Sequence, residues 1–183
     1  MRSGRRIAQH RLRQVRVPAG MVPYDPQWPQ VFEQLRARVG AALASVEHVT
    51  EHVGSTAVPG LDAKPIVDLD VVVPDRSGVA AARRGLTAAG WRHQGEQGVA
   101  GRGAFAPPAD GPYHHLYVVV AGSEAHRDHV DLRDYLRRRP DEAARYAALK
   151  GRLAYLLTTD RDAYTDGKAE LIGELLRRAR AGG

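Results

Sequence analysis

Two short runs of aliphatic, mostly β-branched residues constrain the fold of this 183-residue chain more than any other feature. Residues 66–73 read Ile-Val-Asp-Leu-Asp-Val-Val-Val and are followed by Pro74, and residues 114–121 read His-His-Leu-Tyr-Val-Val-Val-Ala. Runs of this length and composition, bounded by turn-forming residues, are typical of β-strands. They predict two strong strands, which we expect to lie in a single sheet.

Helical patterns surround these strands. Apolar residues recur every three or four positions from Val31 to Val46, after a proline-rich loop at 22–29, and this spacing predicts a helix. Further helices are predicted at 78–89, at 123–138 with Ser123 as N-cap, at 141–157 and at 160–180. Weaker strand patterns lie at 46–53 and 91–94, and residues 95–112 predict a loop or loose hairpin. The order predicts an α+β or α/β fold, a sheet packed with helices and followed by a helical C-terminal part.

The net charge of +6 is concentrated at the N-terminus. Six of the 27 basic residues are arginines within residues 1–16, which contain no acid, so the remainder carries 21 basic and 21 acidic residues. We therefore expect residues 1–20 to form a basic, disordered tail and residues 21–183 to form a single domain. Such a tail can touch nucleic acid or acidic lipid. The neutral remainder argues against nucleic acid as the main partner.

Missing residue types exclude several function classes. The chain has no cysteine, so disulfides, thiolate zinc sites and cysteine nucleophiles are impossible. No apolar run approaches the roughly 18 residues that a membrane-spanning helix needs. We expect no membrane partner and a cytoplasmic location.

Three motif matches do not survive a check of their structural context. The sequence His48-Val-Thr-Glu-His52 resembles a zinc-protease motif, but that motif needs a helix, and a strand would hold the two histidines about 13 Å apart. Residues 101–106 match a dinucleotide-binding pattern, but Pro107 and Pro108 stand where its helix should begin. His126 and His129 share a helix face, which is either a metal pair or, as we favour, a solvated surface.

One constellation points to a chemistry. Asp68 and Asp70 alternate with apolar residues, so a strand projects both carboxylates from one face, with Cβ atoms roughly 7 Å apart. Adjacent carboxylates repel unless they share a proton or a cation, and hard oxygen ligands suit Mg²⁺ or Mn²⁺. Gly54-Ser55, separated from Asp68 by twelve residues, would offer backbone N–H groups and a hydroxyl to a phosphate. An anion site beside a divalent metal is the arrangement of phosphoryl and nucleotidyl transfer.

These residues also carry a resemblance to a known family. The chain resembles the GrpB-like family of the DNA polymerase β-type nucleotidyltransferase superfamily, over about residues 17–180. The stretches that carry the resemblance are 22–29, Glu51 to Leu61, Ala63 to Asp70, Gly101-Arg102, His114 to Leu116, Leu132 to Leu136, Tyr146 to Lys150 and Asp162 to Lys168.

The resemblance implies a nucleotidyltransferase-like mixed β-sheet with Mg²⁺ or Mn²⁺ on the catalytic carboxylates of Asp68 and Asp70. It implies phosphate or nucleotide contacts by Gly54, Ser55, Thr56, Lys64, His114, His115, Arg133, Tyr164 and Lys168. Structural alternatives are an ion pair of Arg133 with Asp134 or Glu142, and helix packing for Tyr164 and Lys168. The superfamily's third carboxylate has no counterpart in residues 113–120, where His115 could complete the site.

The resemblance implies two alternative functions, and the basic tail suggests a third. The first is a metal-dependent nucleotidyltransferase that moves a nucleoside monophosphate from a nucleoside triphosphate to an unknown acceptor. The second is a non-catalytic nucleotide-binding or regulatory module, because relatives occur fused to dephospho-CoA kinase. The third, which the neutral domain disfavours, is a nucleic-acid binder acting through the arginine tail.

Overall fold

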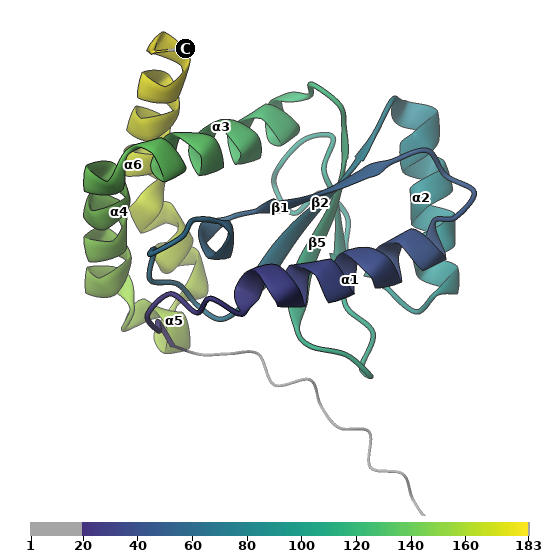
Figure 1. Cartoon of the computed structure of the whole chain (residues 1–183), viewed down its shortest axis with the longest axis horizontal. Helices are drawn as coiled ribbons and strands as arrows, with labels where there is room; N and C mark the ends of the chain where they lie inside the picture. Colours follow the sequence, from purple (N-terminus) through teal and green to yellow (C-terminus); the bar gives the residue numbers. More distant parts are fainter. Residues whose placement is uncertain (1–19, 183) are drawn as a thin grey trace, which may run out of the picture.

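The computed structural model describes residues 20–182 (Figure 1). Its elements, in chain order, are α1 (Trp28–Ala42), β1 (Val49–Val53), η1 (Ser55–Ala57), β2 (Val67–Val73), α2 (Arg76–Ala88), β3 (Arg92–His93), β4 (Gly103–Ala106), β5 (His114–Val120), α3 (Glu124–Arg138), α4 (Pro140–Leu153), α5 (Leu156–Thr159) and α6 (Arg161–Ala181). The predicted α+β class with a helical C-terminal part is confirmed. The tail predicted for residues 1–20 falls almost entirely outside the described residues.

The five strands form one mixed sheet in the order β1-β2-β5-β4-β3. The two strongest strand patterns of the sequence, β2 and β5, lie at its centre and are its parallel pair, whereas the other neighbours are antiparallel. Their register pairs Asp68 with His115 and Asp70 with Tyr117. Because alternate residues of a strand face opposite sides, these four side chains point to the same face of the sheet.

The two faces of the sheet are covered differently. Helices α1 and α2 pack on one face, where a cluster that includes Leu43, Val71, Leu86 and Val118 forms the main core. The opposite face, which carries Asp68 and Asp70, meets α3. A second apolar cluster lies within the helices α3, α4 and α6 and includes Leu61, Tyr146 and Leu175. Figure 1 shows these helices gathered on one side of the sheet. Leu61 belongs to the loop after η1, so this cluster fastens that loop to the helical part.

The structure corrects three boundaries of the sequence prediction. Helix α1 ends at Ala42, and Val46 lies in the turn that leads into β1, where it still packs on the main core. The segment at 95–112, predicted as a loop or loose hairpin, contains strand β4, which pairs antiparallel with both β3 and β5 and thus agrees with the hairpin alternative. The single helix predicted at 141–157 is divided into α4 and α5 by a turn at 154–155. In each case, packing or pairing with neighbouring segments sets the boundary, rather than the local sequence pattern alone.

No helix among residues 20–182 combines the length and apolar character that crossing a membrane requires. The cytoplasmic location stays a prediction.

Candidate functional site

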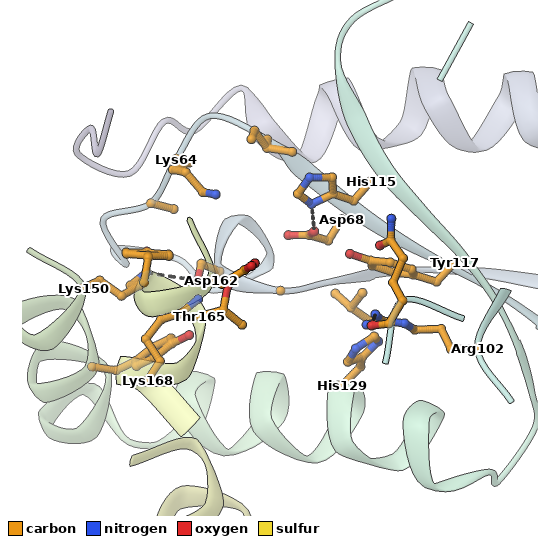
Figure 2. A pocket seen from close by; sticks show the side chains of 18 of the residues that line it. Lys64, Asp68, Arg102, His115, Tyr117, His129, Lys150, Asp162, Thr165 and Lys168 are labelled. Carbon is orange, nitrogen blue, oxygen red and sulfur yellow. Dashed lines mark hydrogen bonds and ion pairs between the residues drawn. The ribbon is translucent and has the colours of Figure 1, made fainter. Parts of the chain in front are cut away.

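A cavity of about 870 Å³ opens between the α3-facing side of the sheet and the helical part (Figure 2). Seven of the eleven residues predicted for the site line it: Gly54, Ser55, Lys64, Asp68, His115, Tyr164 and Lys168. The turn after β1, the strands β2 and β5 and the helices α3, α4 and α6 all contribute to the wall. Segments far apart in the sequence therefore meet at one place.

The two aspartates of β2 are held by separate histidines. Asp68 reaches the cavity with 24% of its side chain exposed, and His115 Nδ1 donates a 2.7 Å hydrogen bond to its Oδ1. Asp70 is fully buried, and His129 Nδ1 lies 3.0 and 2.9 Å from its two carboxylate oxygens. Each carboxylate is therefore already compensated by an imidazole from a neighbouring element.

His129 corrects a prediction. We favoured a solvated helix face for His126 and His129, but the side chain of His129 turns inward from α3 and lines the cavity beside Asp70. His126 accepts a hydrogen bond from the backbone N–H of Gly122 instead and lies near Glu51. The two histidines thus do not act as a pair.

The buried Asp70–His129 pair favours keeping a proton. Burial raises the pKa of Asp70 above its usual range, against the opposing effect of the His129 hydrogen bond. Burial alone would lower the pKa of His129, but the hydrogen bond and the charge of Asp70 together raise it. Both directions favour a proton shared between the two side chains.

Gly54 allows the turn after β1 to approach Asp68 closely. Its φ of +71° lies in the region that favours glycine, and a Cβ at this position would come within 2.3 Å of Asp68 Oδ2. The glycine therefore fixes both the path of the turn and the room for the carboxylate.

Replacing Gly54 by alanine is expected to destabilise the protein by about 2 kcal/mol, because backbone strain and displacement of Asp68 add together. Gly60→Ala is the matched control, since Gly60 also has a positive φ of +79° but open space around it. It should cost about 1 kcal/mol, the strain alone. Urea unfolding measures both variants. Equal losses would show that the approach of Asp68 does not require the glycine.

Thr56, next in η1, faces away from the cavity. It is buried, and its Oγ1 lies 3.0 Å from His52 Nε2. Burial lowers the pKa of His52 to about 4, so this histidine is neutral and packs flat against Phe32. The position of Thr56 supports a structural role for its side chain.

All three lysines of the chain line the cavity, at the end nearest the helical part. Lys150, on α4, is only 2% exposed, and its Nζ donates hydrogen bonds to Ser55 Oγ at 3.0 Å and to the carbonyl of Asp62 at 2.6 Å. Nζ of Lys64 and Nζ of Lys168 lie 5.5 and 4.2 Å from the ring centroid of Tyr164. This arrangement makes one end of the cavity cationic.

Lys150 was not among the residues predicted for the site. Burial and the charges of Lys168 and Lys64, against those of Asp62 and Asp68, together lower its pKa to about 7. It lies in one of the stretches that carry the family resemblance, and it is one of only three lysines in this arginine-rich chain. A buried cation beside a serine hydroxyl and other cations is poised to receive an anion.

Besides Thr56 and the buried Asp70, two predicted residues do not line the cavity. His114 is 1% exposed on the opposite face of β5, where Trp91 Nε1 donates to its Nε2 at 3.1 Å and its own Nδ1 donates to the Pro112 carbonyl. Arg133 pairs with Glu51 and Asp134, which agrees with one of its structural alternatives. Strand parity explains His114: only one of two adjacent histidines can face the cavity, and it is His115.

Several further residues line the cavity that were not among the predicted site residues, although five of them lie in stretches that carry the family resemblance. They are Gln94, Gln97, Arg102, Tyr113, Tyr117, Tyr146, Asp162, Thr165 and Asp166. Asp162, Thr165 and Asp166 come from the first turns of α6. The others reach the site through the β3–β4 segment, β5 and α4, and no local pattern predicts such convergence.

The family resemblance implies a bound Mg²⁺ or Mn²⁺, and the side chains at the site can be compared with the ligands that such an ion requires. Among the residues that the structure describes, no three His, Asp or Glu side chains are grouped as a metal site. Two carboxylates on one strand face are nevertheless a hard-oxygen pair, and Mg²⁺ is usually held by one or two carboxylates together with water and substrate phosphates. The residues therefore fit a cation that arrives with a phosphate ligand, rather than one in an all-protein cage.

The fold and the cavity define a mixed-sheet α+β protein in which Asp68 and three lysines line one pocket, with Asp70 buried beside it. Comparison with known proteins assigns it: the family model described as GrpB protein matches residues 18–178, and the chain belongs to this family. It is 41% identical over 165 residues to UPF0157 protein PA4798 of Pseudomonas aeruginosa, covering 88% of this chain and 67% of that protein.

Two further similarities define the extent of the match. The crystal structure of conserved protein GrpB from Enterococcus faecalis is 29% identical, with a TM-score of 0.76 over 87% of this chain and 96% of that one. A dephospho-CoA kinase of Mycolicibacterium paratuberculosis is 26% identical over 189 residues, which cover 90% of this chain but 46% of the kinase. Most of this chain thus corresponds to less than half of that protein.

Proposed function

We propose that the cavity binds a nucleoside triphosphate with Mg²⁺ or Mn²⁺, and that the protein transfers the nucleoside monophosphate to an acceptor. The observation that carries the proposal is the placement of Asp68 and the three lysines in one cavity, with Asp70 directly behind Asp68. Carboxylates for a cation and ammonium groups for phosphates are the two requirements of this chemistry.

The lysine end would hold the phosphates. Lys150 and Ser55 already form a hydrogen-bonded pair, and Gly54 keeps the adjacent backbone close. Lys64 and Lys168 approach the same region around Tyr164. Cations in a partly dry pocket stabilise the charge that develops on a departing phosphate more strongly than they would in water.

The carboxylate pair would hold the cation, which when bound supplies positive charge for the phosphate oxygens. Asp68 is the accessible ligand, and Asp70 supports it from the buried side. His115 and His129 orient the two carboxylates in its absence. We propose no role for Arg133, because it lies outside the cavity.

The reaction is a single displacement at the α-phosphorus. The acceptor's hydroxyl oxygen forms a bond to that phosphorus, the bond from it to the bridging oxygen of the β-phosphate breaks, and pyrophosphate leaves. The acceptor's proton passes to water. The lysine end balances the charge on the pyrophosphate.

A nucleotide-binding module without catalysis is the second candidate. One observation favours it: Asp70 is fully buried, and both of its oxygens are engaged by His129. The similarity to part of a dephospho-CoA kinase is compatible with a regulatory module joined to an enzyme.

Pyrophosphate release separates the two candidates. The protein is incubated with Mg²⁺ and each of the four nucleoside triphosphates, alone and with a bacterial metabolite extract, and labelled product is sought by mass spectrometry. A transferase releases pyrophosphate in step with a new nucleotidylated compound. Nucleotide binding without either product supports the module and contradicts the transferase.

A further inference from the structure

The cavity carries a second cationic group, away from the lysines. Figure 2 shows Lys64, Lys150 and Lys168 on one side and Arg102 with Tyr117 on the other, with Asp68 between them. Arg102 belongs to the segment that leads into β4, whereas Lys150 and Lys168 come from the helical part. The two cationic ends are therefore built by separate parts of the fold.

Most of the hydrogen-bonding capacity of Arg102 is unused by the protein. Its guanidinium carbon lies 4.4 Å from the ring centroid of Tyr117, and its only hydrogen bond within residues 20–182 is a 3.3 Å contact to the carbonyl of Gln97. Its Nε is buried without a partner, and no carboxylate in the described part of the chain pairs with it. A planar group with five donors, stacked on an aromatic ring, is suited to a carboxylate or phosphate.

The segment that carries Arg102, residues 94–102, contributes several side chains to the cavity wall. Gln97, a cavity-lining residue, has a φ of +48°, which is strained for a non-glycine residue. Its side-chain amide donates to the Gln94 side chain at 3.2 Å, and Gln94 lines the cavity too. Glu96 accepts a 2.9 Å hydrogen bond from the Gly101 backbone and closes the turn. Two amides and one guanidinium are thus presented together.

Arg38 shows how this chain treats an arginine that serves only the structure. It also stacks on an aromatic ring, with its guanidinium carbon 5.3 Å from the Trp91 centroid. Its guanidinium, however, donates to Asp110 at 2.6 Å. Arg102 has the same stacking without the carboxylate, so a position for an oxyanion is left open.

We propose that Arg102, with Gln94 and Gln97, binds an oxyanion group, a carboxylate or a phosphate, of a small-molecule acceptor. Calling the ligand an acceptor rests on the proposed function, because Asp68 lies between this end and the phosphate end. The oxyanion subsite itself rests only on the contacts of Arg102. The acceptor would carry a hydroxyl near its anionic group, so that the hydroxyl faces the carboxylates.

A small molecule fits better than a nucleic-acid chain. The cavity of about 870 Å³ must also hold the nucleotide, which leaves room for a compact ligand. Residues 17–183 carry equal numbers of acidic and basic side chains, so they lack the excess positive charge with which proteins track a phosphate backbone.

The test observes Arg102 directly. The Nε–H signal of Arg102, assigned with an Arg102→Lys variant, is followed by NMR while inorganic phosphate and, separately, glycolate are added to the full chain. We expect at least one anion to shift this signal saturably, while the Arg38 signal stays in place. In Arg102→Gln, followed through the Gln97 side-chain amide, the affinity should fall about 10-fold.

A Lys150→Met variant tests whether anion binding at Arg102 is separate from the lysine end of the cavity. The response of Arg102 should stay within about twofold of wild type, because the subsite does not use the lysine end. A response that disappears in Lys150→Met, or an Arg102 signal that neither anion moves, overturns the proposal. A shift caused only by a short single-stranded RNA also overturns it, in favour of a nucleic-acid ligand.

The outcome is independent of nucleotide binding. If no nucleoside triphosphate binds but phosphate or glycolate moves Arg102, the proposed function fails and the subsite stands. If a nucleotide binds but neither anion moves the Arg102 signal, the subsite fails and the proposed function stands.

Discussion

Replacing Asp70 by asparagine is expected to reduce pyrophosphate release at least 100-fold, which corresponds to about 3 kcal/mol in the barrier. Asparagine keeps the size of the side chain but removes its negative charge and one of its two acceptor oxygens. The cation would then lose a ligand, and His129 would face an amide in place of a carboxylate. The measurement is the rate of pyrophosphate release at saturating nucleotide.

Two controls make this result interpretable. Asp110→Asn removes an exposed carboxylate whose one ion-pair partner among residues 20–182 is Arg38, outside the cavity, and it should leave the rate unchanged. Because Asp70 is fully buried, urea unfolding of the variant has to show that it still folds. An unchanged rate in folded Asp70→Asn would remove Asp70 from the reaction.

Replacing Lys150 by methionine is expected to stabilise the free protein, and to do so more at low pH. Burial lowers the pKa of Lys150 from its usual 10.5 to about 7, so the unfolded chain binds the proton more tightly than the folded one. The cost of the buried cation is complete below pH 7 and fades as the pH rises toward 10.5. The gain should therefore be about 3 kcal/mol larger at pH 6 than at pH 9.

Arg152→Met is the matched control, because Arg152 lies on the same helix, α4, and is exposed. Its effect on the free energy of unfolding should not depend on pH between these values. Urea unfolding of wild type and both variants at pH 6 and pH 9 gives the change in the free energy of unfolding for each variant at each pH. A gain for Lys150→Met that is equal at the two pH values would show that Lys150 is not a buried cation in the folded state.

A residue that lowers the stability of the free protein in this way is expected to serve a function. A lysine that costs free energy when the cavity is free recovers it when an anion arrives, as buried charges do when they are paired. The same substitution that stabilises the free protein should therefore weaken nucleotide binding. Stability and affinity are expected to change in opposite directions at this position.

The centre of the fold could be predicted from the sequence because it is encoded locally. The runs around Leu69 and Leu116 are rich in buried aliphatic residues, and they form the central parallel pair. The bounds of strand β4 could not be predicted, because its four residues are held by pairing with β3 and β5 rather than by a pattern of their own.

The candidate site was predictable only where it depends on strand parity and short loops. Asp68, Asp70 and His115 follow from alternation, which also explains why His114 turns away. His129 lies 59 positions from Asp70, and Lys150 lies 95 positions from Ser55. Such contacts depend on how the helices pack across the sheet, and no local sequence pattern indicates that packing.

The central claim is that the cavity binds a nucleoside triphosphate together with a metal ion held by Asp68 and Asp70. Calorimetric titration tests it most directly, with Mg²⁺ and each of the four nucleoside triphosphates, on wild type, on Asp68→Asn/Asp70→Asn and on Asp110→Asn. We predict metal-dependent binding of at least one nucleotide to wild type and to Asp110→Asn, and its loss in the double variant. No binding to the folded wild type, or equal binding by the double variant, would contradict the account.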